Sequence, residues 1–231
     1  MLATKTSFIN EVSNLAERLG ADIEQVRIGI GPEPRIGYQF IYPGCGYGGS
    51  CFPKDVRALG ATAAESGYEM GTLRAVEAAN HYQKTKPFSY INQYFNHDFK
   101  GKTFAVWGLA FKPHTDDMRE APSRTLLEAL WQAGARVKAY DPKAMGKARR
   151  LLYPRQTDLQ LCKTRDEVLE GADGLVICTE WQHFRASNFE QILRSLKSTV
   201  IFDGRNLSEP QMLKQMGINY FGIGRGDSVT H

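Results

Sequence analysis

The hydrophobic pattern of this chain changes near Lys102. Before that point, apolar residues follow the period of an α-helix in four segments, residues 2–19, 22–30, 53–65 and 72–95. After it, short apolar runs of strand length alternate with segments of helical period. Strands that alternate with helices are typical of a parallel, doubly wound sheet. The change therefore predicts an α/β protein with two domains, a helical one over residues 1–98 and a sheet domain over residues 99–231.

The predicted sheet has one edge at which a ligand is expected. Strands are predicted at residues 103–107, 137–140, 174–178, 199–202 and 219–221. Helical segments are predicted between them at residues 121–133, 165–169, 188–196 and 209–215. Ligands of such sheets bind beyond the carboxyl ends of the strands. Those ends correspond to residues 108–119, Asp141, residues 179–181 and residues 203–206.

Composition excludes several classes of protein. A net charge of +4, from 29 basic and 25 acidic residues spread along the chain, gives no reason to expect a nucleic acid or an anionic membrane as partner. No apolar run approaches the roughly 20 residues of a membrane span, and the N-terminus lacks a signal-peptide core, so we expect a soluble, unexported protein. The four cysteines are too few and too irregularly spaced for a secreted disulfide framework, so we expect a cytoplasmic protein. The cysteines form no CxxC pair and the histidines no metal-ligand spacing, so we expect no bound metal.

The densest chemical signal is a glycine-rich loop that precedes a cysteine. Four glycines in the six positions 44–49 allow positive φ angles and close approach of a ligand. Cys51 follows, just before a helix that Pro53 could begin, and a helix N-terminus with Lys54 nearby lowers a thiol pKa from about 8.5. Asp55, four residues on, could orient a water or accept a proton. Cys51 is therefore a candidate nucleophile, and the alternative is a buried, inert cysteine beside an exposed Lys–Asp pair.

This segment, Gly46-Tyr-Gly-Gly-Ser-Cys-Phe-Pro-Lys-Asp-Val56, resembles the active-site loop of the UDP-glucose/GDP-mannose dehydrogenase family. Further motifs of the family follow in order over nearly the whole chain: Arg35-Ile-Gly37, Gly108-Leu-Ala-Phe-Lys112, Thr115-Asp-Asp-Met-Arg-Glu120, Tyr140-Asp-Pro142, Ile177-Cys-Thr-Glu-Trp181 and Phe202-Asp-Gly-Arg205. The resemblance implies a central helical dimerisation domain followed by a Rossmann-like UDP-binding domain. Among family members, the motifs look most like those of enzymes that act on UDP-glucose.

The resemblance also implies a reaction. Two successive hydride transfers to NAD would oxidise the C6 alcohol of the sugar to a carboxylate, giving UDP-glucuronate. Cys51 would add to the intermediate aldehyde as a thiohemiacetal, and the resulting thioester would be hydrolysed by water. Asp55 would position that water. Lys54, Arg119 and Cys51 itself would lie at the NAD cofactor.

Substrate contacts carry over to ten positions: Arg35, Tyr42, Pro43, Gly44, Gly46, Tyr47, Gly48, Phe111, Lys112 and Arg205. The segment from Tyr42 to Gly48 would wrap the sugar and diphosphate. Phe111 and Lys112 would contact the nucleotide sugar, and Arg35 would reach the substrate of a neighbouring subunit. For each lone cation, the alternative is a solvated surface charge.

One part of the family pattern has no counterpart in these 231 residues. The family's N-terminal NAD-binding domain, with its G-x-G-x-x-G turn, is absent, and an uncapped apolar helix begins almost at Met1. We therefore expect a fragment that forms a homodimer through the central helix and is inactive alone. Two alternatives stay open: a family member that acts on UDP-N-acetylhexosamine or GDP-mannose, and a nucleotide-binding or interaction module without catalysis.

Overall fold

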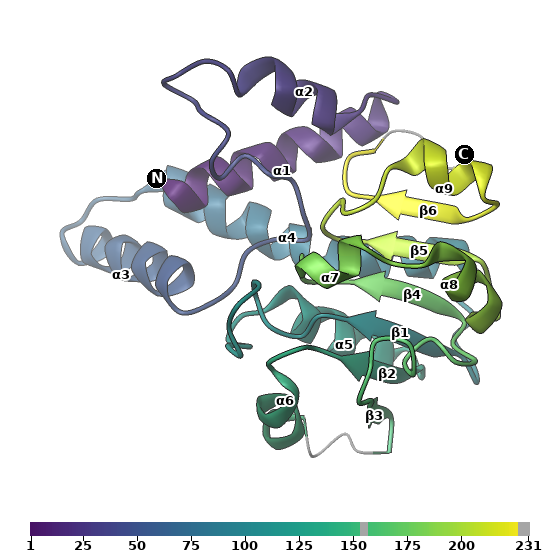
Figure 1. Ribbon diagram of the computed structural model, residues 1–231. Helices are drawn as coiled ribbons and strands as arrows, with labels where there is room; N and C mark the ends of the chain where they lie inside the picture. The colour runs from purple at the N-terminus through teal and green to yellow at the C-terminus, as the bar shows by residue number, and fades with distance from the viewer. Residues whose placement is uncertain (153–156, 226–231) are drawn as a thin grey trace.

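The computed structural model describes residues 1–152 and 157–225, and its first part is a layer of helices (Figure 1). These helices are α1 (Leu2–Arg18), α2 (Ile23–Ile30), α3 (Cys51–Glu65) and α4 (Gly71–Tyr94). Each of the four predicted helical segments forms a helix. Helix α3 begins at Cys51, two residues before the predicted start at Pro53, so the cysteine is its first residue.

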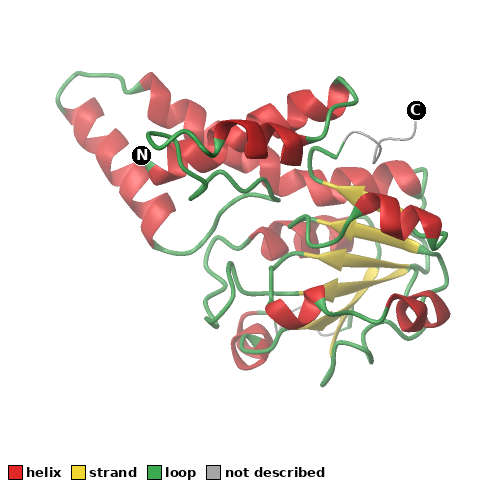
Figure 2. Ribbon diagram, turned by 45° about the horizontal axis from the view of Figure 1, so that its top comes forward, coloured by secondary structure: helices red, strands yellow, loops and turns green. Residues whose placement is uncertain are grey.

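The second part is a six-stranded sheet with helices on both faces (Figure 2). Its strands are β1 (Thr103–Trp107), β2 (Arg136–Tyr140), β3 (Leu159–Leu161), β4 (Gly174–Ile177), β5 (Val200–Asp203) and β6 (Asn219–Gly222). All neighbouring strands pair in parallel, in the order β3-β2-β1-β4-β5-β6. The connecting helices are α5 (Pro122–Gln132), α6 (Met145–Leu151), α7 (Gln182–Arg185), α8 (Phe189–Ser195) and α9 (Pro210–Gln215). The predicted doubly wound sheet is confirmed.

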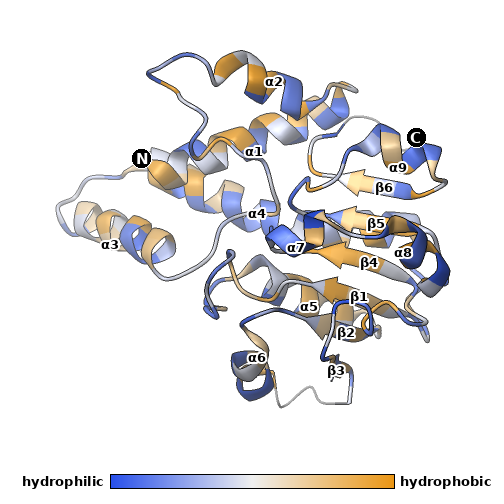
Figure 3. Cartoon of the chain, viewed as in Figure 1, coloured by the Kyte–Doolittle hydropathy of each residue, from blue (hydrophilic) through white to orange (hydrophobic). Residues whose placement is uncertain are grey.

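Each face of the sheet has its own hydrophobic core, and Figure 3 shows how apolar the central strands are. On one face, Phe104 and Phe202 pack with Leu127 of α5 and with Tyr90 and Ile91 of α4. On the other face, residues of β1, β4 and β5 pack with α7, α8 and α9. Because successive side chains of a strand point to opposite faces, strands buried on both sides are apolar throughout. Because Tyr90 and Ile91 pack on the sheet, α4 belongs both to the helical layer and to the helices that cover one face of the sheet.

One predicted helix is wrong and three short elements escape prediction. Residues 165–169 form turns rather than a helix. There, Glu167 donates its backbone N–H to Thr164 Oγ1 at 3.1 Å and accepts the Lys163 N–H at 2.8 Å, and such local side-chain bonds compete with helical ones. The missed elements, α6, α7 and β3, have 7, 4 and 3 residues. Segments of that length show too little periodicity to be recognised.

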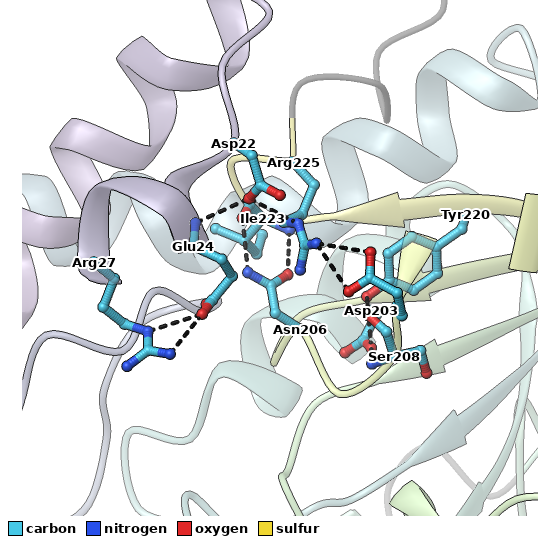
Figure 4. A network of polar contacts seen from close by, with 10 residues as sticks. Asp22, Glu24, Arg27, Asp203, Asn206, Ser208, Tyr220, Ile223 and Arg225 are labelled. Carbon is cyan, nitrogen blue, oxygen red and sulfur yellow. Dashed lines mark hydrogen bonds and ion pairs between the residues drawn. The ribbon is translucent and has the colours of Figure 1, made fainter. Parts of the chain in front are cut away.

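Polar contacts fasten the helical layer to itself and to the sheet. Within the layer, Glu17 of α1 accepts hydrogen bonds from Lys86 Nζ at 2.9 Å and Tyr90 Oη at 2.6 Å, both on α4. At the sheet, Arg225 lies 2.9 Å from Asp22 (Figure 4) and 3.4 Å from Glu209. Asp22 also caps α2 by accepting the Glu24 N–H. One carboxylate thus starts a helix and holds that helix against the end of the sheet part.

Candidate active site

The glycine loop, residues 43–49, is buried between the helical layer and the sheet. On the helical side, Asn10 of α1 accepts the Gly44 N–H at 3.0 Å, and Gln83 of α4 donates to Gly44 O at 2.8 Å. Asn80 of α4 accepts the Tyr47 N–H at 2.9 Å and donates to Tyr47 O at 3.2 Å. Backbone groups that a helix or sheet would satisfy are here satisfied by amide side chains.

On the sheet side, the same loop is bound to the segments that follow the strands. Cys45 donates its N–H to Gly204 O at 2.7 Å, just beyond β5. Gly49 donates its N–H to Arg119 O at 2.7 Å, in the segment beyond β1. The loop therefore contacts the edge of the sheet at which ligands of parallel sheets bind.

Two of the glycines are required by close contacts. A Cβ atom at Gly48 would lie 2.4 Å from the carbonyl oxygen of Glu120. Gly49 has φ +81°, and a Cβ there would lie 2.8 Å from the Phe111 ring. Phe111, a predicted substrate contact, lies in the segment that follows β1. The glycine loop and this segment therefore pack directly against each other.

Cys51 is the exposed cysteine among the four, all of which are free. It is the first residue of α3, and its Sγ lies 3.8 Å from Ser50 Oγ. Burial raises the pKa of the Cys45 and Cys178 thiols, and it raises the pKa of Cys162 to about 11. The chain therefore offers one accessible thiol, at a helix N-terminus.

The other residues predicted beside Cys51 are exposed and lie near it. Lys54 and Asp55 occupy the first turns of α3. Arg119 forms a two-pronged ion pair with Asp117, with Nη2 2.7 Å from Oδ2 and Nε 3.0 Å from Oδ1. The pKa of Arg119 is raised by this hydrogen bond with Asp117. The backbone carbonyl of Arg119 accepts the Gly49 N–H at 2.7 Å, so Arg119 lies beside the loop that ends two residues before Cys51.

At the sheet edge, Arg205 presents a buried donor without a partner. Its Nε donates to Cys178 O at 2.9 Å and lies 3.2 Å from Glu180 Oε2, so the guanidinium is fixed. Its Nη2 is buried and makes no hydrogen bond within the described residues. Lys112 is exposed, with Nζ 5.4 Å from the centre of the Phe111 ring. Both cations thus lie beyond strand ends, Lys112 after β1 and Arg205 after β5.

Asp141, at the end of β2, is fully buried and has a structural role. Its carboxylate accepts backbone N–H bonds from Leu109 at 2.7 Å, Ala110 at 3.0 Å, and Lys143 and Ala144 at 2.8 Å. The bonds from Leu109 and Ala110 fix the turn that leads to Phe111 and Lys112, and those from Lys143 and Ala144 fix the turn that follows β2. An acidic residue at the end of the second strand is the one that binds a ribose in dinucleotide-binding folds, but this carboxylate is already used.

Two predicted substrate contacts have exposed side chains whose described partners lie outside this cluster. The Arg35 side chain is 88% exposed and pairs with Glu33 at 2.7 Å, a local contact. Tyr42 is 61% exposed, and its ring lies 4.6 Å from the Arg27 guanidinium. Within one chain, the described contacts do not bring Arg35 to Cys51 or to Arg205.

A residue that the sequence did not single out holds the loop that carries Arg205. Asn206 has φ +51°, and its amide exchanges two 2.8 Å hydrogen bonds with the backbone of Ile223 (Figure 4). Asp203 accepts the Arg205 N–H at 2.9 Å and the Tyr220 hydroxyl at 2.9 Å. The sequence offers one signal for this position. It is an asparagine just after a strand end, and asparagine tolerates the left-handed conformation that turns require.

In the part of the chain that the structure describes, no cluster of His, Cys, Asp and Glu side chains could hold a metal ion. Nor does any described helix have the length and hydrophobicity needed to cross a membrane.

Comparison with known proteins identifies the class to which this fold and loop belong. Residues 1–82 match the central domain of the UDP-glucose/GDP-mannose dehydrogenase family, and residues 105–210 match its UDP binding domain. The chain belongs to this family.

Individual relatives agree with that assignment. A UDP-glucose 6-dehydrogenase of Pseudomonas aeruginosa is 50% identical over 228 residues, which cover 97% of this chain and 50% of the relative. The solved UDP-glucose dehydrogenase of Pyrobaculum islandicum is 34% identical with a TM-score of 0.81, covering 91% of this chain and 46% of its own. A UDP-D-ManNAc dehydrogenase of Pyrococcus horikoshii is 27% identical with a TM-score of 0.81, covering 97% and 49%. The chain spans about half the length of the relatives it matches.

Proposed function

We propose that this chain supplies the thiol and the nucleotide-sugar site of an enzyme that oxidises UDP-glucose to UDP-glucuronate. The observation that carries the proposal is the link between the two sites. The buried glycine loop leads directly to the exposed Cys51, and the same loop is hydrogen-bonded beside Arg205 at the sheet edge. A sugar nucleotide bound at that edge would have its sugar next to the thiol.

The substrate would be held by cations at the strand ends. The unpartnered Nη2 of Arg205 can donate to the substrate without giving up another hydrogen bond. Lys112 is exposed and free to meet a phosphate or a sugar oxygen. Charged hydrogen bonds of this kind contribute about 1.5–3 kcal/mol each. The loop from Tyr42 to Gly48 would enclose the sugar and diphosphate.

The thiol would then retain the intermediate aldehyde. The Sγ of Cys51 adds to the C6 carbonyl carbon, the thiol proton goes to the carbonyl oxygen, and a thiohemiacetal forms. Once the same carbon has been oxidised to a thioester, water attacks it and releases the carboxylate and the free thiol. Asp55 is exposed one turn along α3 from Cys51 and would orient that water.

The residues present do not form a complete NAD site. NAD would supply the hydride acceptor for both oxidations. The turn after β1 lacks the G-x-G-x-x-G pattern of NAD-binding turns, and the Asp141 carboxylate already accepts hydrogen bonds from backbone N–H groups. Lys54 and Arg119 are the exposed cations beside Cys51 that could contact such a cofactor. We therefore expect the 231 residues alone to produce no NADH from UDP-glucose and NAD.

We further propose that the whole protein is a homodimer formed through the helical layer. Phe8 and Leu15 on α1, Leu19 just after it and Tyr82 on α4 are exposed by 59%, 56%, 72% and 50%. Arg35, which the described contacts do not bring to Cys51 or Arg205 of its own chain, would reach the substrate of the partner. A UDP-N-acetylhexosamine is the second candidate substrate, because a relative of similar fold is a UDP-D-ManNAc dehydrogenase. GDP-mannose is a further alternative within the family.

Iodoacetamide modification of Cys51 tests the proposal. Saturating UDP-glucose should slow alkylation of Cys51 in the wild-type chain, whereas glucose alone should not. A Cys51→Ser variant identifies the modified thiol by mass spectrometry. Alkylation that is equally fast with and without UDP-glucose would contradict a sugar site at this thiol and favour a nucleotide-binding module without catalysis.

A further inference from the structure

Glu120 lies where the helical layer, the glycine loop and the sheet part meet. Its backbone has φ +53°, in the left-handed region that costs energy for a residue with a side chain. Its carbonyl oxygen packs against Gly48, and the preceding residue, Arg119, accepts the Gly49 N–H. The loop that leads to Cys51 therefore fits around the backbone of Glu120.

The Glu120 carboxylate also joins two helices to the sheet part. Arg57 of α3 donates to its Oε1 from Nη1 and Nη2, both at 3.2 Å, and Lys84 of α4 donates to Oε2 at 3.3 Å. Of the hydrogen bonds and ion pairs that α3 side chains make in the described residues, those of Arg57 to Glu120 are the ones that reach the sheet part. Since Cys51 begins α3, this ion pair constrains the helix that carries the thiol.

The charges of the cluster formed by Arg57, Lys84, Glu77 and Glu120 cancel only when Glu120 is ionised. Burial lowers the pKa of Lys84, which is 9% exposed, while Glu120 opposes that shift. Although burial alone would raise the pKa of Glu120, Lys84 and Arg57 together hold that pKa below its usual value. Loss of the carboxylate would leave a buried ammonium group without a counter-ion and Arg57 with Glu77 alone.

We propose that Glu120 is a positioning residue that, through Arg57, holds α3 so that Cys51 faces a nucleotide sugar bound at the sheet edge. The proposal rests on the function proposed above and deepens it. That function needs a thiol and a UDP-sugar site, and Glu120 is the group that couples the two. Binding of UDP-glucose at the sheet edge should consequently slow the alkylation of Cys51 to its full extent only while the Arg57–Glu120 ion pair is intact.

The protection of Cys51 by UDP-glucose measures this coupling in the 231-residue chain. In Glu120→Gln, which removes the charge and keeps the shape, calorimetry should give a dissociation constant for UDP-glucose within about threefold of wild type. The slowing of Cys51 alkylation by bound UDP-glucose should fall by at least about threefold, a typical size for coupling between residues in contact. Glu120→Asp, which keeps the charge, should retain part of the protection.

A second variant covers the case in which Glu120→Gln does not fold. Arg57→Gln leaves the Lys84–Glu120 pair intact, removes the link to α3, and should lose protection to the same extent. Glu69→Gln breaks the exposed Arg74–Glu69 ion pair near the end of α3 and is the matched control, with unchanged protection. A purely structural role would lower the melting temperature of the Glu120 and Arg57 variants and leave the protection ratio alone.

The possible results separate the two proposals. Full protection in a folded Arg57→Gln or Glu120→Gln chain overturns the positioning role and leaves the proposed function standing. A wild-type chain that binds UDP-glucose without any protection of Cys51 overturns the proposed function, and the positioning role with it.

Discussion

Gly48 and Glu120 touch across the boundary between the helical layer and the sheet: a Cβ atom on Gly48 would lie 2.4 Å from the Glu120 carbonyl oxygen. The neighbour is backbone in a left-handed conformation and cannot rotate away. This contact explains why the loop that delivers the thiol is rich in glycine, and it leads to the first prediction.

Gly48→Ala should destabilise the chain by about 1–3 kcal/mol, because overpacking against fixed backbone must displace the loop. Gly60, inside α3, is the matched control, since apart from its chain neighbours and the adjacent backbone of its own helix no atom lies within 4 Å of its Cβ position. Gly60→Ala should stabilise the chain by about 0.5–1 kcal/mol through helix propensity. Urea unfolding of both variants measures the difference, and equal effects would mean that the Gly48 contact is unimportant.

The second prediction concerns the thiols. Iodoacetamide at pH 8 should modify Cys51 and leave Cys45 and Cys178 unmodified in the folded chain. The buried thiols are shielded, and burial raises the pKa of both, whereas Cys51 is exposed. Peptide mapping after limited reaction identifies the modified sites. Modification of Cys45 before Cys51 would contradict the burial of the glycine loop.

The third prediction concerns the strand-end cations. Lys112→Ala and Arg205→Ala should each weaken UDP binding by about 10–150-fold, which corresponds to the loss of one charged hydrogen bond. Arg194→Ala, which removes a side chain that is 77% exposed and paired with Glu190, should leave binding unchanged. Calorimetry with UDP separates these cases. Unchanged affinity in the Arg205 variant would show that its free Nη2 does not meet the ligand.

The fourth prediction concerns the helical layer. Glu17→Gln should cost about 3–5 kcal/mol of unfolding free energy, because it leaves the Lys86 ammonium buried without its partner. The two side chains are 9% and 10% exposed. Glu190→Gln, in the exposed pair with Arg194, should cost less than about 1 kcal/mol. Nearly equal denaturant midpoints for Glu17→Gln and Glu190→Gln would show that the buried Lys86–Glu17 pair is not a structural link.

The fifth prediction is a loss of stability at high pH. Burial, followed by the charge of Glu17, raises the pKa of Tyr90 well above its usual value, and burial and Asp203 do the same for Tyr220. A raised pKa in the folded state means that the proton is bound more tightly there than in the unfolded chain. The stabilisation is therefore complete below about pH 10, the pKa of an unperturbed tyrosine, and is lost as the pH rises above it.

Unfolding by urea between pH 8 and pH 11.5 checks that sign. The wild-type midpoint should fall from about pH 10 upward. In Tyr90→Phe and Tyr220→Phe the fall should be shallower, because one titrating group is gone. A midpoint that rises with pH in this range would contradict the assignment.

Much of this architecture could be predicted from the sequence. The helices around the loop and the strands of the sheet follow from periodicity and from apolar runs, since both strand faces are buried. Residues 165–169 could not be predicted, because Thr164 and Glu167 divert backbone groups into side-chain hydrogen bonds. The division at residues 98 and 99 stays a prediction, although α4 ends at Tyr94 and β1 begins at Thr103.

The candidate site could be predicted only in part. The sequence pointed to the cysteine loop, and the structure shows Cys51 at a helix start and exposed. The sequence did not reveal that the Asp141 carboxylate is already hydrogen-bonded to backbone N–H groups. Nor did it reveal that Glu120 contacts the glycine loop and that Asn206 fixes the segment of Arg205. Such roles depend on which distant groups the fold brings together, and no local spacing encodes them. The catalytic and binding roles of the individual residues stay predictions.

The binding of a uridine nucleotide at the sheet edge can be measured by titration calorimetry of the 231-residue chain with UDP, UDP-glucose and GDP-mannose. UDP and UDP-glucose should bind, GDP-mannose should not, and Arg205→Ala should weaken the binding of both uridine ligands. Binding of GDP-mannose alone, or of none of the three, would contradict this prediction.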